Sequence, residues 1–296
     1  MAGIFRKIKK KVARLGLDPE WDVVIRPRTG WFDINLREVW RYRDLAKLYV
    51  YRDFTVTYKQ TILGPLWWLI QPLFTSGVYS IIFGGIAGIP TDGVPPLLFY
   101  VSGVVFWGYF SSCLSDTSNT FLANSGVFGK VYFPRLVVPL AAVFSDLFKF
   151  SIQFVLFLLV YFIFFLRGVP VQPNLCILLL PLLVAHMAVM GMGLGIIASS
   201  LTTKYRDLSF FMSYIIQLLM YATPIIYPFS MIPAKWRVIA LLNPMVPVME
   251  IFRYAFFGIG NFDARMVVWS ICFTLVVIFL GVVVFSRVEK NFMDTI

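Results

Sequence analysis

Residues 51–72 read YRDFTVTYKQTILGPLWWLIQP, passing from charged and aromatic residues into an apolar segment. No charged residue occurs from Gln60 to Thr91. A transmembrane helix needs about 20 mostly apolar residues, so this segment can cross a bilayer. The basic and aromatic half suits the membrane surface, where cationic and aromatic side chains gather. Gln71 is then a polar residue inside a membrane span, and its position there has to be explained, because polar side chains in the membrane are costly.

Five such charge-free runs occur in the chain, and a sixth apolar segment, Leu136–Leu166, is long enough to span but contains Asp146 and Lys149. Of its 296 residues, 59% are hydrophobic and 14% are charged, whereas soluble domains are about half apolar and a quarter charged. We therefore predict an all-α integral membrane protein with six transmembrane helices within residues 61–296. The six segments are Gln60–Thr91, Gly93–Ser115, Leu136–Leu166, Gly168–Thr203, Leu208–Ala234 and Met266–Ser286.

The N-terminal region is basic and sets the predicted orientation. Before Gln60 there are 14 Lys or Arg and 7 Asp or Glu residues. No apolar run follows the cluster Arg6–Lys11 closely enough for a signal peptide, so residues 1–35 are expected to be retained as a basic cytoplasmic segment. Met1–Leu15 can equally be a solvated tail. Short loops with Lys130, Arg135 and other cations fall on the same side, which predicts that both termini are cytoplasmic.

Two regions are predicted to lie along the membrane surface. Residues 36–60 combine apolar positions such as Val39, Trp40 and Phe54 with many basic ones, which is typical of a cytoplasmic amphipathic interface helix. Residues 234–262 contain an uncharged core of 12 residues, Val238–Met249. That core is too short to cross and is interrupted by Pro244 and Pro247, so we predict short re-entrant external helices between spans five and six.

Polar and aromatic residues form stripes on two predicted spans. They recur at helical spacing, so each stripe shares one face. Polar groups in lipid are costly unless they face protein or water. Two such faces can line a shared path for a sugar chain, or they can be helix–helix contacts and interface aromatics. The stripes are Gln71, Thr75 and Tyr79 on the first span, and Phe210, Tyr214, Gln217 and Tyr221 on the fifth.

Other intramembrane features have a structural and a functional interpretation. Asp146 and Lys149 are spaced to pair on one helix face, as a structural pair or with a direct role. His186 is a proton relay or a packing residue. The small residues Ala188, Gly195 and Ser199 share roughly one face and predict close helix packing.

The chain shows no motif for catalysis. HExxH and GxSxG are absent, and GVFGKVY at 126–132 lacks the spacing of a phosphate loop. Three cysteines in separate apolar segments indicate neither a disulfide framework nor a metal site. We expect no catalytic residue, metal or cofactor in this chain, so any uphill transport takes its energy from a partner or an ion gradient.

Residues 124–133 are too apolar for a solvated loop. The sequence NSGVFGKVYF contains two glycines, which are common in loops, together with aliphatic and aromatic residues, and Pro134 follows it. We therefore predict a small helix that docks into another protein. Its docking residues are Val127, Phe128, Lys130, Tyr132 and Phe133.

Five motifs together resemble the membrane subunit of ABC-2 type exporters, specifically the group that exports polysaccharides and lipopolysaccharide O-antigen. The similarity covers roughly Arg37 to the C-terminus. The motifs are RDFTVTYKQTILGPLWWLIQP (52–72), KVYFPRLVVPL (130–140), TKYRDL (203–208), TPIIYP (223–228) and NPMVPVMEIFR (243–253).

The resemblance implies a homodimer in the bacterial inner membrane that binds two copies of a separate ABC ATPase, which holds ATP and magnesium. Residues 124–133 would be the coupling helix, and spans one and five would face a pore between the two copies. The cargo would be a glycan on a polyprenyl diphosphate lipid. Arg52, Lys59 and Arg206 would contact the diphosphate or lipid head groups, because such cations pair well with phosphate. Membrane lipids are partners and nucleic acid is not.

Other functions remain open from the residues alone. A membrane glycosyltransferase would need paired carboxylates for a metal–diphosphate donor, and Asp207 lacks a close acidic neighbour. A secondary transporter or channel would show repeats or charged pathway residues. Within the ABC-2 group, teichoic acid, capsule, lipid or drug are alternative cargoes. Neither the sugar nor the host envelope follows from the sequence.

Overall fold

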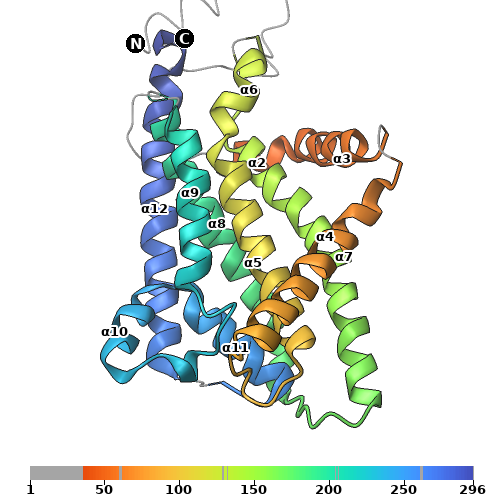
Figure 1. The fold of residues 1–296 in the computed structure, drawn as a ribbon. Helices are drawn as coiled ribbons and strands as arrows, with labels where there is room; N and C mark the ends of the chain where they lie inside the picture. Colours follow the sequence, from red (N-terminus) through yellow and green to blue (C-terminus); the bar gives the residue numbers. More distant parts are fainter. Residues whose placement is uncertain are drawn as a thin grey trace, which may run out of the picture. The chain divides into compact units, whose positions relative to one another are not determined.

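The computed structural model describes residues 36–59, 62–128, 130–131, 133–203, 205, 207–260 and 263–295. Regular structure in these ranges is helical, as predicted (Figure 1). The predicted basic segment 1–35 lies outside them. The helices are α2 (Leu36–Arg41), α3 (Arg43–Lys59), α4 (Trp67–Tyr79), α5 (Pro96–Ser118), α6 (Thr120–Phe128), α7 (Val137–Leu166), α8 (Leu180–Thr202), α9 (Leu208–Ala222), α10 (Ala234–Leu242), α11 (Met245–Phe257) and α12 (Ala264–Thr295).

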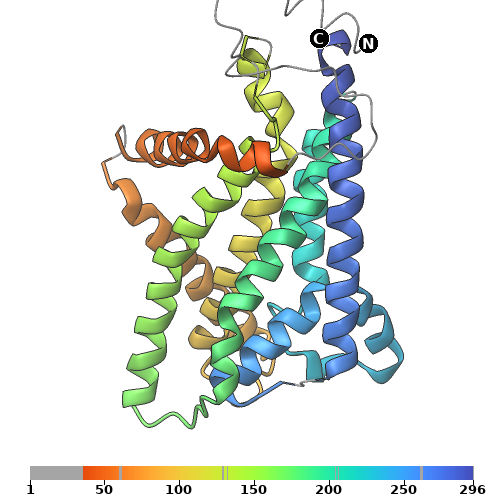
Figure 2. The same cartoon turned by 180° about the vertical axis from the view of Figure 1, so that it is seen from behind.

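The long helices form one bundle with α3 lying across one end (Figures 1 and 2). We call this the α3 end; it also carries α6 and the last turns of α12. The opposite end, which carries α10 and α11, is the α11 end. Helices α4, α7 and α9 run from the α3 end to the α11 end, and α5, α8 and α12 run back. The chain therefore crosses the bundle in alternating directions.

Five helical segments are long and apolar enough to span a membrane, and the fifth predicted span is shorter than expected. The predicted segment Leu208–Ala234 forms only the 15-residue helix α9, which ends at Ala222. At 1.5 Å per residue a helix of that length rises about 22 Å. Pro224 and Pro228, which follow, cannot continue a helix. The five segments are Gly64–Ile86, Pro96–Ser118, Val137–Leu166, Leu175–Thr202 and Ala264–Val288.

The two short helices predicted in residues 234–262 are present as α10 and α11, which are bent by 106° relative to each other. The break falls at Asn243 and Pro244. The prediction that Pro247 interrupts a helix is wrong, because it lies in the first turn of α11, where its missing N–H would have no partner. Helix α11 is also more deeply buried than a surface helix, and its Phe252 ring lies 3.9 Å from that of Phe106 on α5.

Helix α5 is the centre of the core. In its apolar window 72% of the residues are buried, compared with 11% for the segment that contains α4. Helices α4, α7, α8 and α9 all contact it. The fold therefore packs around α5 and leaves α4 and α9 at its edge.

Glycines in α8 bring three helices into backbone contact. A Cβ at Gly191 would lie 3.2 Å from the Phe110 carbonyl oxygen of α5, and one at Gly193 would lie 3.1 Å from the Ile278 Cα of α12. On the α5 side, the Ser199 hydroxyl accepts a hydrogen bond from the Phe121 N–H at 3.3 Å. The predicted close packing is confirmed, because only small residues let backbones approach this closely.

Helix α3 packs its apolar face on protein. Tyr49 is buried beside Phe133, with ring centroids 6.5 Å apart, and Phe54 meets Phe148 of α7 edge to face at 5.2 Å. Trp40, predicted on the apolar face, is exposed instead. The predicted helix 36–60 is divided into α2 and α3, and Gln60 lies outside the described residues.

His186 has polar neighbours of a structural kind. Its Nε2 lies 2.8 Å from the Ser270 hydroxyl of α12, which donates to the Pro244 carbonyl oxygen at 2.6 Å. The contact ties α8 and α12 to the break before α11. No carboxylate takes part in these hydrogen bonds, which favours packing over a proton relay.

We predict that Gly195→Ala lowers the apparent melting temperature of the purified protein by several degrees. The new Cβ would overlap the Thr117 side chain and come 2.8 Å from the Leu114 carbonyl oxygen, and overpacking of this kind costs about 1–3 kcal/mol. Gly77→Ala is the matched control, because no atom lies within 4 Å of its Cβ position. Equal melting of wild type and Gly195→Ala would contradict the packing model.

Candidate substrate path

The first predicted stripe runs from the exposed surface of α4 at Gln71 toward the core, where Tyr79 packs on Tyr100 of α5 with ring centroids 6.1 Å apart. Gln71 is exposed, whereas Thr75 and Tyr79 are half-buried. Pro72 sits inside the helix, and a π-helical segment, Ser80–Ile86, follows it directly. Such irregular turns are frequent at functional sites. The stripe therefore runs along a helix whose far end departs from regular geometry.

The second stripe lies on the exposed surface of α9. Its aromatic members Phe210 and Tyr214 are 81% and 66% exposed. Gln217 and Tyr221 are exposed as well, and α9 has no buried residue along its length. The face predicted from the spacing therefore exists, and the described part of the chain leaves it exposed.

The two stripes meet at the α11 end. The Tyr79 hydroxyl donates to the Met220 sulfur at 4.0 Å and lies near Tyr221. Toward the α3 end, α4 diverges from α9 in both views (Figures 1 and 2). Gln71 and Phe210, near that end, are consequently not brought together within the chain.

A further aromatic hollow, not predicted from the sequence, lies beyond this junction. It has a volume of about 490 Å³, and Tyr227, Trp236 and Asn243 are among its lining residues. The Tyr227 hydroxyl donates to the Tyr221 carbonyl oxygen at 2.9 Å, and burial raises the pKa of Tyr227, which remains a neutral phenol at pH 7. The sequence feature that could have indicated this hollow is the TPIIYP motif, which contains Tyr227.

A buried arginine fixes the segment that carries this hollow. Arg253 of α11 is 1% exposed, and its guanidinium carbon lies 3.9 Å from the ring centre of Phe99. One of its nitrogens donates to the Ile225 carbonyl oxygen at 3.3 Å, and Glu250 lies 3.9 Å away. Because a buried cation is costly without such partners, these contacts hold the TPIIYP segment against α5 and α11.

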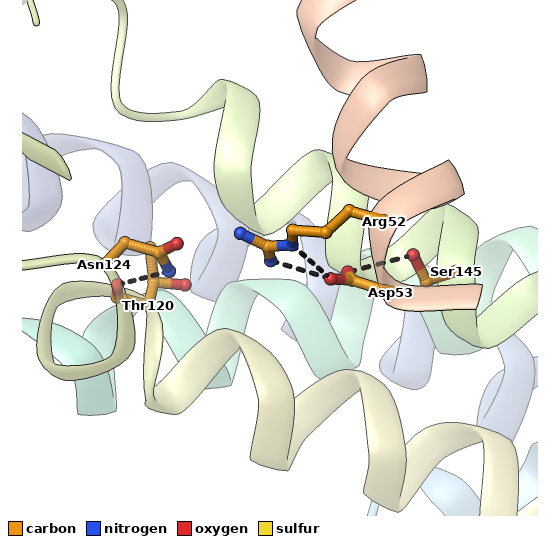
Figure 3. A network of polar contacts seen from close by, with 5 residues as sticks. All are labelled: Arg52, Asp53, Thr120, Asn124 and Ser145. Carbon is orange, nitrogen blue, oxygen red and sulfur yellow. Dashed lines mark hydrogen bonds and ion pairs between the residues drawn. The ribbon is translucent and has the colours of Figure 1, made fainter. Parts of the chain in front are cut away.

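The three residues predicted to contact the diphosphate differ in how available their charges are. Arg52 of α3 donates through two nitrogens to one carboxylate oxygen of Asp53, at 2.9 and 2.7 Å (Figure 3). Its guanidinium carbon also lies 4.5 Å from the ring centre of Tyr49. Its charge is therefore already paired in this conformation. Lys59 is exposed at the last position of α3, and Arg206 lies outside the described residues.

The predicted docking segment differs from its expected bounds. The short helix spans Thr120–Phe128 as α6, and residues 130–131 turn away from it. Phe128 and Phe133 are buried against each other with centroids 5.7 Å apart. Among the described members, Val127 and Lys130 remain exposed and available to a partner; Tyr132 lies outside the described residues.

Residues 45–257 match the family model of the ABC-2 type transporter. This region runs from α3 to the end of α11 and contains both stripes, α6 and the aromatic hollow. The chain belongs to the ABC-2 type transporter family. Membership in this family, together with the apolar helices, makes it a multi-pass membrane protein and a transport subunit.

Named relatives of this ABC-2 type transporter chain match it over most of their length. It is 28% identical over 253 residues to the O-antigen export system permease protein RfbA of Klebsiella pneumoniae, covering 85% of this chain and 94% of the relative. It is 24% identical to the protein of the same name from Myxococcus xanthus, covering 88% and 98%. The polysialic acid transport protein KpsM of Escherichia coli is 22% identical, covering 82% and 93%.

Proposed function

We propose that this chain is the membrane subunit of an ATP-driven exporter that moves a polyprenyl-diphosphate-linked polysaccharide, of the O-antigen kind, across the bacterial inner membrane. The observation that carries the proposal is the pair of aromatic and amide faces on α4 and α9, which meet at Tyr79 and Met220. The relatives named for O-antigen export support the cargo class.

The composition of the two faces suits a glycan. Sugar rings present apolar C–H faces to aromatic rings and hydroxyl edges to amides and phenols, and Tyr and Gln side chains offer both kinds of surface. An ion would need charge or a carbonyl cage instead. The stripes contain neither an acid nor a base, so a neutral or repeating sugar chain can slide along them without a deep electrostatic trap.

A second copy of the chain completes the path in this proposal. Gln71 and Gln217 are exposed on the surface of the bundle, and polar groups at membrane depth need protein or water as neighbours. Two copies that bring their α4 and α9 faces together would enclose these residues. The glycan would then pass between the copies, from the α3 end to the hollow beside Tyr227 and Trp236.

Energy enters through a separate ATPase in this proposal. Two copies of that subunit bind ATP and magnesium, and each docks on the α3 end through the exposed side of α6, around Val127 and Lys130. The α3 end is then cytoplasmic, together with both termini. Lys59, Arg206 and Arg52 meet the lipid diphosphate there, and Arg52 must leave Asp53 to do so.

We predict that loss of this chain makes polyprenyl-linked glycan accumulate on the cytoplasmic leaflet and disappear from the cell surface. Complementation with Tyr79→Ala or Tyr221→Ala should restore less than about a tenth of export, since burial of an aromatic side chain against the cargo contributes about 1.5–3 kcal/mol. Phe162→Ala, which removes an exposed aromatic of α7, is the matched control and should export normally.

The measurement is fluorescent lectin or antibody labelling of surface glycan, with extraction of the lipid-linked intermediate. Unchanged surface glycan without any accumulated intermediate would overturn the cargo assignment and leave teichoic acid, capsule, lipid or drug as cargo. Normal export by both tyrosine variants would remove the stripes from the path.

We predict that Val127→Asp prevents co-purification of the cognate ABC ATPase and leaves the melting temperature of the chain unchanged. Val127 is exposed on α6, so a carboxylate there is solvated in the free chain and becomes buried only when the ATPase docks. Val56→Asp, at an exposed site on α3 outside the spans, is the control for the effect of an added carboxylate at this end of the bundle. Intact co-purification with Val127→Asp would exclude this surface of α6 as the docking site.

A further inference from the structure

A polar cavity lies at the α3 end, and of its charged lining residues the transport proposal uses only Arg52. Its volume is about 580 Å³, and α3, α4, α5, α6 and α7 all contribute to its lining. Charged side chains from three helices face it: Arg52 and Asp53 from α3, Asp116 from α5, and Asp146 and Lys149 from α7. Figure 3 shows one rim, where Asp53 accepts a hydrogen bond from Ser145 at 3.3 Å.

Asp146 has an unsatisfied oxygen in this cavity. The side chain is 4% exposed, and its Oδ2 atom has no hydrogen-bond partner. The predicted pair with Lys149 is not formed, because the Lys149 ammonium donates to the Ser112 hydroxyl at 3.4 Å instead. Asp116 of α5 faces the same cavity and, with Lys149, is a charged group that acts on Asp146. A buried carboxyl oxygen without a donor is costly, and a ligand that donates hydrogen bonds, such as an ammonium, would satisfy it.

The charges of the cavity exclude a diphosphate as that ligand. Three carboxylates face two cations, and one of those cations, Arg52, is already held by Asp53 through two nitrogens. A diphosphate would add negative charge beside Asp116 and Asp146. The diphosphate proposed as cargo therefore binds elsewhere on this end, and the cavity is built for a different group.

A metal ion fits the cavity less well than an ammonium. No group of three His, Cys, Asp or Glu side chains that could hold a metal occurs in the described part of the chain, whereas calcium takes six to eight oxygen ligands. A primary ammonium carries three donors and is satisfied by two carboxylates and one further acceptor. The adjacent carboxyls of Asp116 and Asp146, with Asn119 beside them in the lining, offer that set.

The other lining residues indicate that the ammonium belongs to a phospholipid. Phe54, Trp68 and Phe148 form one aromatic cluster in the wall, with centroids 5.2–6.4 Å apart. Trp68 lies in the first turn of α4, near the start of the apolar span, at the level expected for lipid head groups. Lys149, whose contact in the structure is a hydroxyl, can pair with a phosphate oxygen.

We propose that the cavity formed by α3, α5 and α7 binds the head group of an ethanolamine phospholipid. The ammonium lies on Asp116 and Asp146, and the phosphate lies toward Lys149. The bound lipid joins α3 to the core helix α5 at the end where the ATPase docks. Binding requires neither the ATPase nor a glycan, so the proposal stands or falls independently of the transported cargo.

The test is native mass spectrometry of the full-length chain purified with equal amounts of phosphatidylethanolamine, phosphatidylcholine and phosphatidylglycerol of identical acyl chains. We expect phosphatidylethanolamine to be retained about tenfold over phosphatidylcholine, whose methylated ammonium cannot donate hydrogen bonds, because such bonds to charged groups are worth roughly this factor. Asp146→Asn should abolish the preference, and Asp263→Asn, outside the cavity at the start of α12, should keep it.

Asp116→Asn provides a second variant, because Asp116 is exposed on its other side and its change does not threaten the fold. It should weaken the preference even if Asp146→Asn fails to fold. Equal retention of the three lipids, a preference for phosphatidylglycerol, or an unchanged preference in Asp116→Asn would each overturn the proposal.

Discussion

The close approach of α8 to α5 and α12 is the constraint on which the rest of the structure depends. Gly191 and Gly195 place α8 against the backbone of α5, and Gly193 and Gly281 do the same between α8 and α12. In a membrane the lipid is as apolar as the side chains, so helices associate through packing and hydrogen bonds. A three-helix unit held in this way makes α5 the buried centre of the chain and gives the other helices a fixed surface.

That unit also explains why the candidate path lies at the edge. Helix α5 offers its remaining sides to α4, α7 and α9, and α4 and α9 touch little else. Parts of their surfaces remain open, and these parts carry Gln71, Gln217 and Tyr221. At the α11 end, Arg253 holds the TPIIYP segment in place, and this segment carries Tyr227, which lines the aromatic hollow.

The sequence predicted the features that depend on local pattern. Charge-free runs located the spans, because hydrocarbon thickness sets a minimum length, and the i, i+4 spacing of Phe210 and Tyr214 placed them on one face. Long-range geometry was beyond such reasoning. Asp146 was expected to meet Lys149, its neighbour along the helix, but it meets Asp116 from another helix. The end of α9 was placed too late, because Pro224 follows its last turn and cannot continue the helix. Pro247 was judged a helix breaker, but it lies in the first turn of α11, where a proline costs no backbone hydrogen bond.

The central claim is that two copies meet across the α4 and α9 faces. It is tested most directly by cross-linking Leu218→Cys, an exposed position on α9, in native membranes, with Cys176 and Cys272 replaced by serine and the buried Cys113 retained. The account predicts a covalent dimer under oxidation, and none for Leu159→Cys, equally exposed on α7. A dimer through Leu159→Cys with Leu218→Cys remaining monomeric would contradict it.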